Sequence, residues 1–354
     1  MPESFSLWDF MADGADDATG RQVANLLVGL YSYTPVAVAI VELGIPGLLA
    51  GTALTAEEVA SAAGTAPDAT ARLLRAGMAV GLLATDPSGR FTLTEMGNRL
   101  GPGNGSLGDL AGFWLAPIRD AMAGLADHVR SGRRVNPAAP GGLWDYLGRH
   151  PDNAARFSRA MGYVTSRLLA ALTAAGYRPP PCQRIVDVGG SRGTLLAWFL
   201  KAVPGATGVV LDRAESLAAA PGYLASAGVA DRAELVAGNF LAEVPDGDLH
   251  VLSQVMHNWD DENVRRIAGN CARAARPGGS LVVIEYALPS VPVPANGHLQ
   301  DILMMVLFGG RERTLEEHRE LIEPAGYTLT REVPVGATTT GQQPPWRVLQ
   351  FRRD

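Results

Sequence analysis

The chain has 354 residues, which at roughly 150 residues per domain suggests two domains and a sizeable core. Its content of 47% hydrophobic and 19% charged residues excludes a disordered or fibrous chain. The net charge of −6 gives no indication of a basic surface for nucleic acid or anionic lipid. The two cysteines, Cys182 and Cys271, are too few for a disulfide framework or a four-ligand zinc site.

The start of the chain carries no sign of a targeting or membrane segment. The N-terminal sequence MPESFSLWDFMADGADD is acidic where a signal peptide would be basic and then apolar. The apolar stretch from Pro35 meets Glu42, far short of the roughly 20 residues that a membrane span needs. These features predict a soluble cytoplasmic protein that binds neither nucleic acid nor a membrane.

Residues 1–177 form the first predicted domain and are mostly helical in pattern. Asp68–Val80 has apolar residues at helical spacing, with Asp68 as its expected cap. Leu54–Thr94 predicts two helices and a hairpin that turns at Pro87, Ser88 and Gly89, which is a winged-helix arrangement. Arg72 and Arg75 are the only basic residues on its candidate recognition helix, so packing or dimerisation is favoured over DNA binding.

The end of this domain is marked by proline and glycine. Pro137–Gly142 is a break in the helical pattern. A helical pattern follows from Asp145 to Ala174 and is expected to restart at Pro151. The proline-rich segment Arg178–Pro181 then leads into the second predicted domain, residues 178–354.

The second domain alternates apolar strands with helices. This alternation predicts an α/β fold with a doubly wound, mostly parallel sheet. The expected strands are residues 184–190, 207–212, 233–240, 249–257 and 281–289, and helices are expected over residues 194–203 and 260–276.

A glycine-rich turn follows the first of these strands, in the sequence Asp187–Gly193. Glycines there let the backbone turn tightly beside a ligand at the carboxyl edge of the sheet. The GxGxxG and GxxxxGK[ST] spacings are missing, so plain packing or a dinucleotide remain alternatives. Asp212 ends the second strand, where a carboxylate can accept hydrogen bonds from a ribose diol; the alternative is a solvated strand end.

A second group of residues offers acid–base chemistry. His257 ends the fourth expected strand, Glu285 ends the fifth, and Glu312 precedes a helix. An imidazole between two carboxylates is held in one tautomer, its protonated form is stabilised, and it can take a proton from a weakly acidic hydroxyl. The alternatives are a structural histidine, a capping role for Glu285, and pairing of Glu312 with Arg311 or Arg313. No second His or Cys is spaced for a metal site with these residues, so no metal is expected.

The order of motifs DVGGSRG, LD, GNF, VMHNWDDE, RPGGSLVVIEYALP and DILMMVLFGGRERT resembles the S-adenosylmethionine (SAM) dependent small-molecule O-methyltransferases. These are plant caffeic acid and flavonoid enzymes and bacterial antibiotic-tailoring enzymes. The resemblance covers nearly the whole chain. It implies a class I, Rossmann-like methyltransferase domain behind a winged-helix-like dimerisation domain. It also implies a homodimer in which each N-terminal region helps to close the partner's substrate pocket.

Residue roles follow from the same resemblance. It implies that His257 is the general base and that Glu285 and Glu312 are the two acids beside it. It assigns SAM binding to residues at the strand ends: Asp187, Gly189, Gly190, Gly193, Asp212, Asn239, Phe240 and Ser253. It assigns the small-molecule acceptor to Phe157, Met161, Asn258, Met304 and Phe308.

Four positions depart from the pattern of the family. Ser191 replaces the usual third glycine, Asn239 the usual acid beside adenine, Ser253 the usual lysine, and Asn258 the usual acid after the base. Asn239 can still make one amide hydrogen bond, so cofactor binding is expected to be weakened rather than lost.

The leading hypothesis is O-methylation of a phenolic or similar hydroxyl on a secondary metabolite, with in-line methyl transfer and His257 as the base. The second is a SAM-binding relative on this fold that performs a decarboxylation, a hydroxylation or a pericyclic step. The third is a winged-helix regulator that senses a small ligand. The sequence does not identify the acceptor or the position that is methylated.

Overall fold

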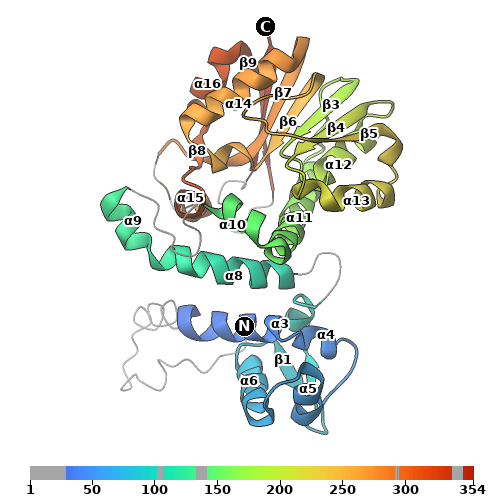
Figure 1. Ribbon diagram of the computed structural model, residues 1–354, viewed down its shortest axis with the longest axis vertical. Helices are drawn as coiled ribbons and strands as arrows, with labels where there is room; N and C mark the ends of the chain where they lie inside the picture. The colour runs from blue at the N-terminus through green and yellow to red at the C-terminus, as the bar shows by residue number, and fades with distance from the viewer. Residues whose placement is uncertain (1–28, 102–106, 133–141, 292, 294, 337–345) are drawn as a thin grey trace. The chain divides into compact units, whose positions relative to one another are not determined.

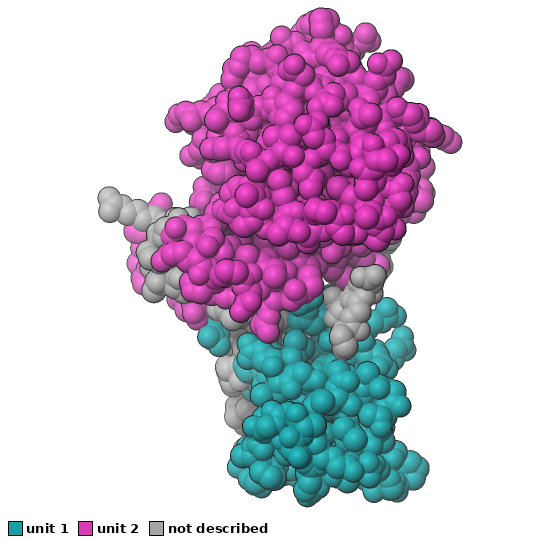
Figure 2. Space-filling view, turned by 45° about the vertical axis from the view of Figure 1, so that its right-hand side comes forward, with its two compact units in different colours: residues 1–119 teal, residues 120–354 magenta. Residues whose placement is uncertain are grey.

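The computed structural model describes the chain except for residues 1–28, 102–106, 133–141, 292, 294 and 337–345 (Figure 1). By contacts the chain divides into two compact units, Met1–Arg119 and Asp120–Asp354 (Figure 2). The boundary between these units lies at residues 119 and 120, whereas the sequence pattern changes near residue 178. The domain boundary expected at residues 177 and 178 stays a prediction. The expected break at Pro137–Gly142 falls, apart from Gly142, outside the described residues.

The smaller unit consists of short helices and one hairpin. Its elements are a π-helical turn Gly29–Tyr33, α3 (Thr34–Glu42), α4 (Ile45–Leu48), α5 (Ala56–Ala63), α6 (Pro67–Ala79), β1 (Leu83–Thr85), β2 (Phe91–Leu93), α7 (Glu95–Asn98) and the start of α8 (Gly108–Ala123). The predicted order of two helices and a hairpin is confirmed by α5, α6 and the antiparallel pair of β1 and β2.

Local sequence signals explain where these helices begin. Thr55 and Glu58 form a capping box at the start of α5, because each side chain accepts a hydrogen bond from the other's backbone N–H. The predicted aspartate cap of α6 is wrong. The N-cap is Ala66, without a side-chain hydrogen bond, and Asp68 lies in the first turn behind Pro67. Proline at the first position presets the helical φ angle there, so the helix begins without a capping side chain.

The larger unit holds the sheet. Its helices are the end of α8, α9 (Leu125–Ser131), α10 (Leu143–Arg149), α11 (Pro151–Ala174), α12 (Thr194–Ala202), α13 (Ala220–Ser226), α14 (Asp261–Ala274), α15 (Asn296–Leu307) and α16 (Leu315–Ile322). Its strands are β3 (Arg184–Val188), β4 (Thr207–Asp212), β5 (Ala233–Ala237), β6 (Gly247–Ser253), β7 (Ala275–Leu288), β8 (Arg313–Thr314), β9 (Tyr327–Val335) and β10 (Trp346–Arg353). The described part of this unit also contains the 3-10 turns Ser216–Ala219, Ala230–Arg232, Met256–Asn258 and Glu323–Ala325.

The sheet is mostly parallel, as predicted. Its strand order is β5-β4-β3-β6-β7-β10-β9, and β8 pairs with β7. The strands β3 to β7 pair with one another in parallel, whereas β10 is antiparallel to both β7 and β9. The chain order reverses between β3 and β6, and ligands bind at such a reversal, beyond the carboxyl ends of the strands.

Two apolar cores cover the two faces of the sheet. Successive residues of one strand point to opposite faces, so Ile185 packs in one core and Val186 in the other. The first core contains residues of α11, α12 and α13, and the second contains residues of α14 and α16. Figure 1 shows α12 and α13 on one side of the sheet and α14 and α16 on the other. The helices therefore wrap both faces, which is the doubly wound arrangement.

Two of the expected boundaries shift next to the site, at α14 and at β6. The helix expected over residues 260–276 is α14, which ends at Ala274 because β7 already begins at Ala275. The fourth strand was expected to reach His257, but β6 ends at Ser253.

No helix among the residues described is both long enough and apolar enough to cross a bilayer.

Candidate active site

His257 lies on a 3-10 turn, Met256–Asn258, instead of at the end of a strand. After β6 the chain reverses at Gln254, whose φ of +54° is rare for a residue with a side chain. The prediction that His257 ends the fourth strand is therefore wrong, because the strand ends at Ser253 and His257 lies on the turn that follows it. Apolar side chains continue through Val255 and Met256, and that run hid the end of the strand.

Glu285 holds this turn from the neighbouring strand, β7. Its Oε1 accepts hydrogen bonds from the backbone N–H of Val255 at 3.0 Å and of Met256 at 2.8 Å. The side chain is 1% exposed, so these two bonds replace water around the carboxylate. Glu285 thus fixes the backbone from which His257 projects.

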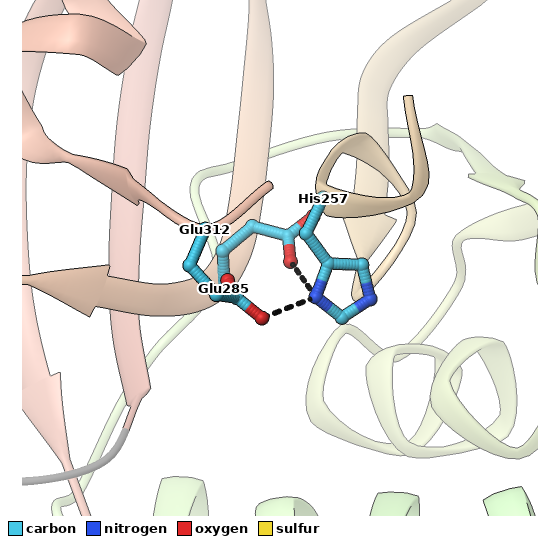
Figure 3. Close-up of side chains that lie close together, drawn as sticks. All are labelled: His257, Glu285 and Glu312. Carbon is cyan, nitrogen blue, oxygen red and sulfur yellow. Dashed lines mark hydrogen bonds and ion pairs between the residues drawn. The ribbon is translucent and has the colours of Figure 1, made fainter. Parts of the chain in front are cut away.

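Two carboxylates face one nitrogen of the imidazole. The Nδ1 atom of His257 lies 2.8 Å from Oε1 of Glu312 and 3.5 Å from Oε2 of Glu285. Figure 3 shows the other ring nitrogen, Nε2, pointing away from both carboxylates. The three residues are buried, each at most 5% exposed. The alternative pairing of Glu312 with Arg311 or Arg313 is wrong, because those arginines pair with Glu317 and Asp261.

Burial and charge act in opposite directions on this ring. Burial alone would lower the pKa of His257, but the charges of Glu285 and Glu312, with the hydrogen bond to Glu312, raise it to about 9. Burial raises the pKa of Glu285, and the positive charge of His257 opposes that rise. The carboxylates therefore favour a proton on the ring, and Nδ1 keeps its hydrogen while Nε2 gains or loses one.

We predict that His257 titrates well above the usual 6.5 in the ligand-free protein. NMR of the protein with ¹⁵N-labelled histidine should place its pKa near 9, and Glu312→Gln should lower that pKa because a neutral amide no longer stabilises the imidazolium. Glu317→Gln is the matched control, since Glu317 pairs with Arg311. A pKa near 6.5 in the parent, or no change in Glu312→Gln, would contradict this electrostatic account.

The glycine turn after β3 depends on unusual backbone angles. Gly189 and Gly193 have φ of +75° and +76°, and Ser191 has φ of +50°. A Cβ on Gly190 would lie 2.5 Å from a carboxylate oxygen of Asp187, so that position needs glycine for packing. Asp187 is buried and accepts the Leu196 N–H at 3.1 Å, and burial raises the pKa of Asp187 to about 7.

Asp212 stands across from this turn at the end of β4. Its Oδ2 accepts the N–H of Ser191 at 2.9 Å, and its Oδ1 accepts the N–H of Arg213 at 2.7 Å. Burial raises its pKa. The Ser216 side chain also hydrogen-bonds to this carboxylate. A carboxylate has about four lone-pair sites in all, so Asp212 can still accept a hydrogen bond from a ribose hydroxyl.

Asn239 and Phe240 follow β5, which ends at Ala237 and not at Phe240 as expected. A Cβ on Gly189 would be 3.7 Å from the Phe240 ring, so this ring borders the glycine turn, and it meets Trp259 edge-on at 5.8 Å. Asn239 is exposed and its Oδ1 accepts the N–H of Leu241, so the amide also closes a local turn. An acidic acceptor, a tight turn and an aromatic face at one sheet edge fit the ribose, the methionyl group and the adenine of SAM.

Ser253 precedes the turn that carries His257, and Asn258 is its last residue. Ser253 is the last residue of β6, and its Cα pairs with that of Ile284 on β7. The amide nitrogen of Asn258 donates to the carbonyl of Gln254 at 3.2 Å. Asn258 thus closes the turn that carries His257, a structural role that the sequence interpretation did not foresee.

Trp144 on α10 joins the two predicted acceptor walls, and the sequence interpretation missed it. Its ring lies 5.7 Å from that of Phe157 on α11 and 5.1 Å from that of Phe308 at the end of α15. Met161 and Met304 lie four residues from Phe157 and Phe308, on the same helical faces. The guanidinium of Arg213, next to Asp212, sits 5.3 Å from the Trp144 ring. Only its place after the Pro/Gly break could have singled out Trp144.

The three site residues also bring possible metal-binding atoms together. One such atom from each of His257, Glu285 and Glu312 lies within 4.8 Å of the others. A cation there would have to displace the proton that Nδ1 shares with Glu312. The expectation that no metal takes part stays a prediction.

The mostly parallel, doubly wound sheet with a glycine turn after β3 has the fold of the class I SAM-dependent methyltransferases. Residues 122–328 match the O-methyltransferase domain family, and residues 26–102 match the O-methyltransferase dimerisation domain. The chain therefore belongs to the O-methyltransferase family, is an enzyme of this kind, and uses SAM as its methyl donor.

Similar proteins act on natural products. The chain is 34% identical to the mitomycin biosynthesis 6-O-methyltransferase of Streptomyces lavendulae over 95% of each chain. It is 30% identical to the phenazine-1-carboxylate N-methyltransferase of Pseudomonas aeruginosa, over 91% of this chain and 96% of the other. The O-methyltransferase of neocarzinostatin biosynthesis, solved with SAM and 2-hydroxy-5-methyl naphthoic acid, superposes with a TM-score of 0.72 at 30% identity, covering 91% and 96% of the two chains.

Proposed function

We propose that this enzyme methylates a phenolic hydroxyl of an aromatic small molecule, with His257 as the general base. The observation that carries the proposal is the orientation of the buried imidazole. Both carboxylates approach Nδ1, which leaves Nε2 as the nitrogen that can receive a proton from an acceptor. The SAM that the enzyme binds supplies an electrophilic methyl group.

The chain's own residues then have to improve the nucleophile and align it. A phenol has a pKa near 10, so little of it is ionised at neutral pH. In the neutral ring, Nε2 of His257 takes the hydroxyl proton as the oxygen attacks, and Glu285 and Glu312 stabilise the imidazolium that forms. General-base catalysis of this kind contributes on the order of 10²–10⁴-fold, and in-line alignment of acceptor and methyl group adds the entropic part.

Two features favour an oxygen acceptor of aromatic type. A phenol must lose its proton on methylation, and the two carboxylates that raise the pKa of His257 make its neutral ring a stronger proton acceptor, whereas a neutral amine can attack before it loses a proton. The rings of Trp144, Phe157 and Phe308 from three separate elements offer flat apolar surface for a planar acceptor. The preserved His257 cluster also argues against a relative that has lost methyl transfer.

The first test is turnover with 2-hydroxy-5-methyl naphthoic acid as a trial acceptor and radiolabelled SAM. We expect His257→Ala to lower kcat by about 10²-fold or more while SAM affinity stays the same, because the base meets the acceptor and not the cofactor. Glu285→Gln and Glu312→Gln should cost less.

The loss in His257→Ala should shrink at high pH, where the phenol ionises unaided. The product should be a methyl ether by mass spectrometry and NMR. A His257→Ala enzyme that keeps most of its turnover at neutral pH would refute the general-base role, and methylation at nitrogen or carbon alone would refute the acceptor class.

A second prediction concerns the cofactor. Asp212→Ala should weaken SAM binding by about 1–3 kcal/mol, the cost of leaving ribose hydroxyls without a charged acceptor. Asp231→Ala, an exposed acid on a neighbouring turn, is the matched control. Calorimetry should show one SAM site per chain in the parent and no binding of NAD. Equal SAM affinity in Asp212→Ala and the parent would remove Asp212 from the site.

A third prediction concerns assembly. The match of residues 26–102 to the dimerisation domain supports a homodimer, in which each N-terminal region helps to close the partner's pocket. Light scattering should give twice the 37.2 kDa of one chain. A chain lacking the residues before Pro137 should lose both dimerisation and activity. A fully active monomer would contradict this assembly.

A further inference from the structure

Arg313 is a buried cation outside the set of residues assigned to the reaction. It is 1% exposed, yet its guanidinium is surrounded by oxygen atoms. Nε and Nη2 donate to Oδ1 of Asp261 at 3.0 and 2.7 Å, and Nη2 also donates to the carbonyl of Trp259 at 2.8 Å. Nη1 donates to the carbonyls of Met256 at 3.2 Å and Arg311 at 3.3 Å. A buried charge is tolerated only when its hydrogen bonds are satisfied in this way.

Two of these carbonyls bracket His257. Met256 precedes it and Trp259 follows Asn258, so one guanidinium holds the 3-10 turn at both ends. The peptide N–H of Met256 is held in turn by Glu285 at 2.8 Å. The turn is therefore gripped by a cation through its carbonyls and by a carboxylate through its amides.

The segment that leads to Arg313 contacts the same turn at every residue. A Cβ on Gly310 would lie 2.1 Å from the carbonyl oxygen of His257, so only glycine fits there. The N–H of Arg311 donates to that same oxygen at 2.9 Å. Oε1 of Glu312 lies 2.8 Å from Nδ1 of His257. Gly310–Arg313 therefore packs against the 3-10 turn Met256–Asn258 and contacts both the backbone and the ring of His257.

We propose that Arg313 is a positioning residue that sets the direction of Nε2 of His257 by holding the carbonyls on both sides of the turn. This inference rests on the proposed function, because the direction of Nε2 matters only if that atom receives the acceptor's proton. Arg313 touches neither the ring of His257 nor, on this account, the acceptor. Its effect on the reaction passes through His257.

The chemistry of the fork makes arginine specific here. The planar guanidinium reaches Asp261 and the two bracketing carbonyls at once, whereas a lysine ammonium is a single compact charge on a flexible stem. Arg313→Lys is expected to keep the charge and the pairing with Asp261 but to lose the simultaneous hydrogen bonds to the carbonyls of Met256 and Trp259. A misplacement of about 1 Å at a reacting group costs roughly 10²-fold in rate, and losing one end of the grip should cost a sizeable part of that.

The experiment compares Arg313→Lys with Arg319→Lys, an exposed arginine of α16 that pairs only with Glu323 among the contacts described. With SAM and the trial naphthoic acid, Arg313→Lys should lower kcat roughly ten- to 100-fold, with SAM affinity unchanged. In the His257→Ala background the same substitution should have no further effect, since it acts through the base. Arg319→Lys should behave as the parent in both backgrounds.

An acceptor-free readout accompanies the kinetics. The proton on Nδ1 of His257, held by Glu312, should give a slowly exchanging low-field NMR signal in the parent and a weakened one in Arg313→Lys. If Arg313→Lys fails to fold, Asp261→Asn serves instead, because it loosens the fork from a partly exposed side chain.

Each outcome decides between the alternatives. An unchanged kcat with an unchanged Nδ1 signal overturns the proposal, and so does a loss of kcat that is fully additive with His257→Ala, since that loss would be structural. Full turnover in His257→Ala would refute the general-base function itself. In that case the Nδ1 signal alone decides whether Arg313 orients the ring.

Discussion

The constraint on which the site depends is the burial of two carboxylates beside one imidazole. Glu285 and Glu312 lie out of water, where a negative charge is costly unless a cation or hydrogen-bond donors offset it. His257 offsets that cost only when protonated, and this is why the pKa of the ring rises to about 9. The same arrangement makes the ring a strong acceptor of a proton at Nε2. The burial of the two carboxylates therefore explains both the raised pKa of His257 and its ability to accept a proton.

The scaffold keeps this cluster rigid through backbone contacts from several elements. The turn that carries His257 is held by Glu285 from β7 and by Arg313 from β8. Two residues with side chains have positive φ angles in the part of the chain described, and both border the site: Ser191 in the glycine turn and Gln254 before the base turn. Such angles persist where the surroundings over-determine them, and they gather at functional sites.

The order of β3 to β7 with α12 and α14 could be predicted from sequence, because apolar runs indicate buried strands, whereas β8, β9 and β10 were not among the expected strands. The position of Asp212 at the end of β4 followed from the same pattern, whereas the prediction that Glu285 ends its strand is wrong, because β7 continues to Leu288. The end of β6 could not be predicted, since Val255 and Met256 are buried like strand residues although they lie beyond the strand. Arg313 could not be recognised either: a charged residue normally predicts a surface, and its buried partners are mostly backbone carbonyls, which have no sequence signature.

The central claim is that Nε2 of His257 receives the proton of the acceptor hydroxyl. The most direct measurement is a crystal structure with S-adenosylhomocysteine and the trial naphthoic acid bound together. The account predicts the acceptor oxygen within about 2.6–3.2 Å of Nε2, in line with the sulfur of the cofactor product. An acceptor oxygen bonded to another group, or an Nε2 turned onto a protein carbonyl, would contradict it.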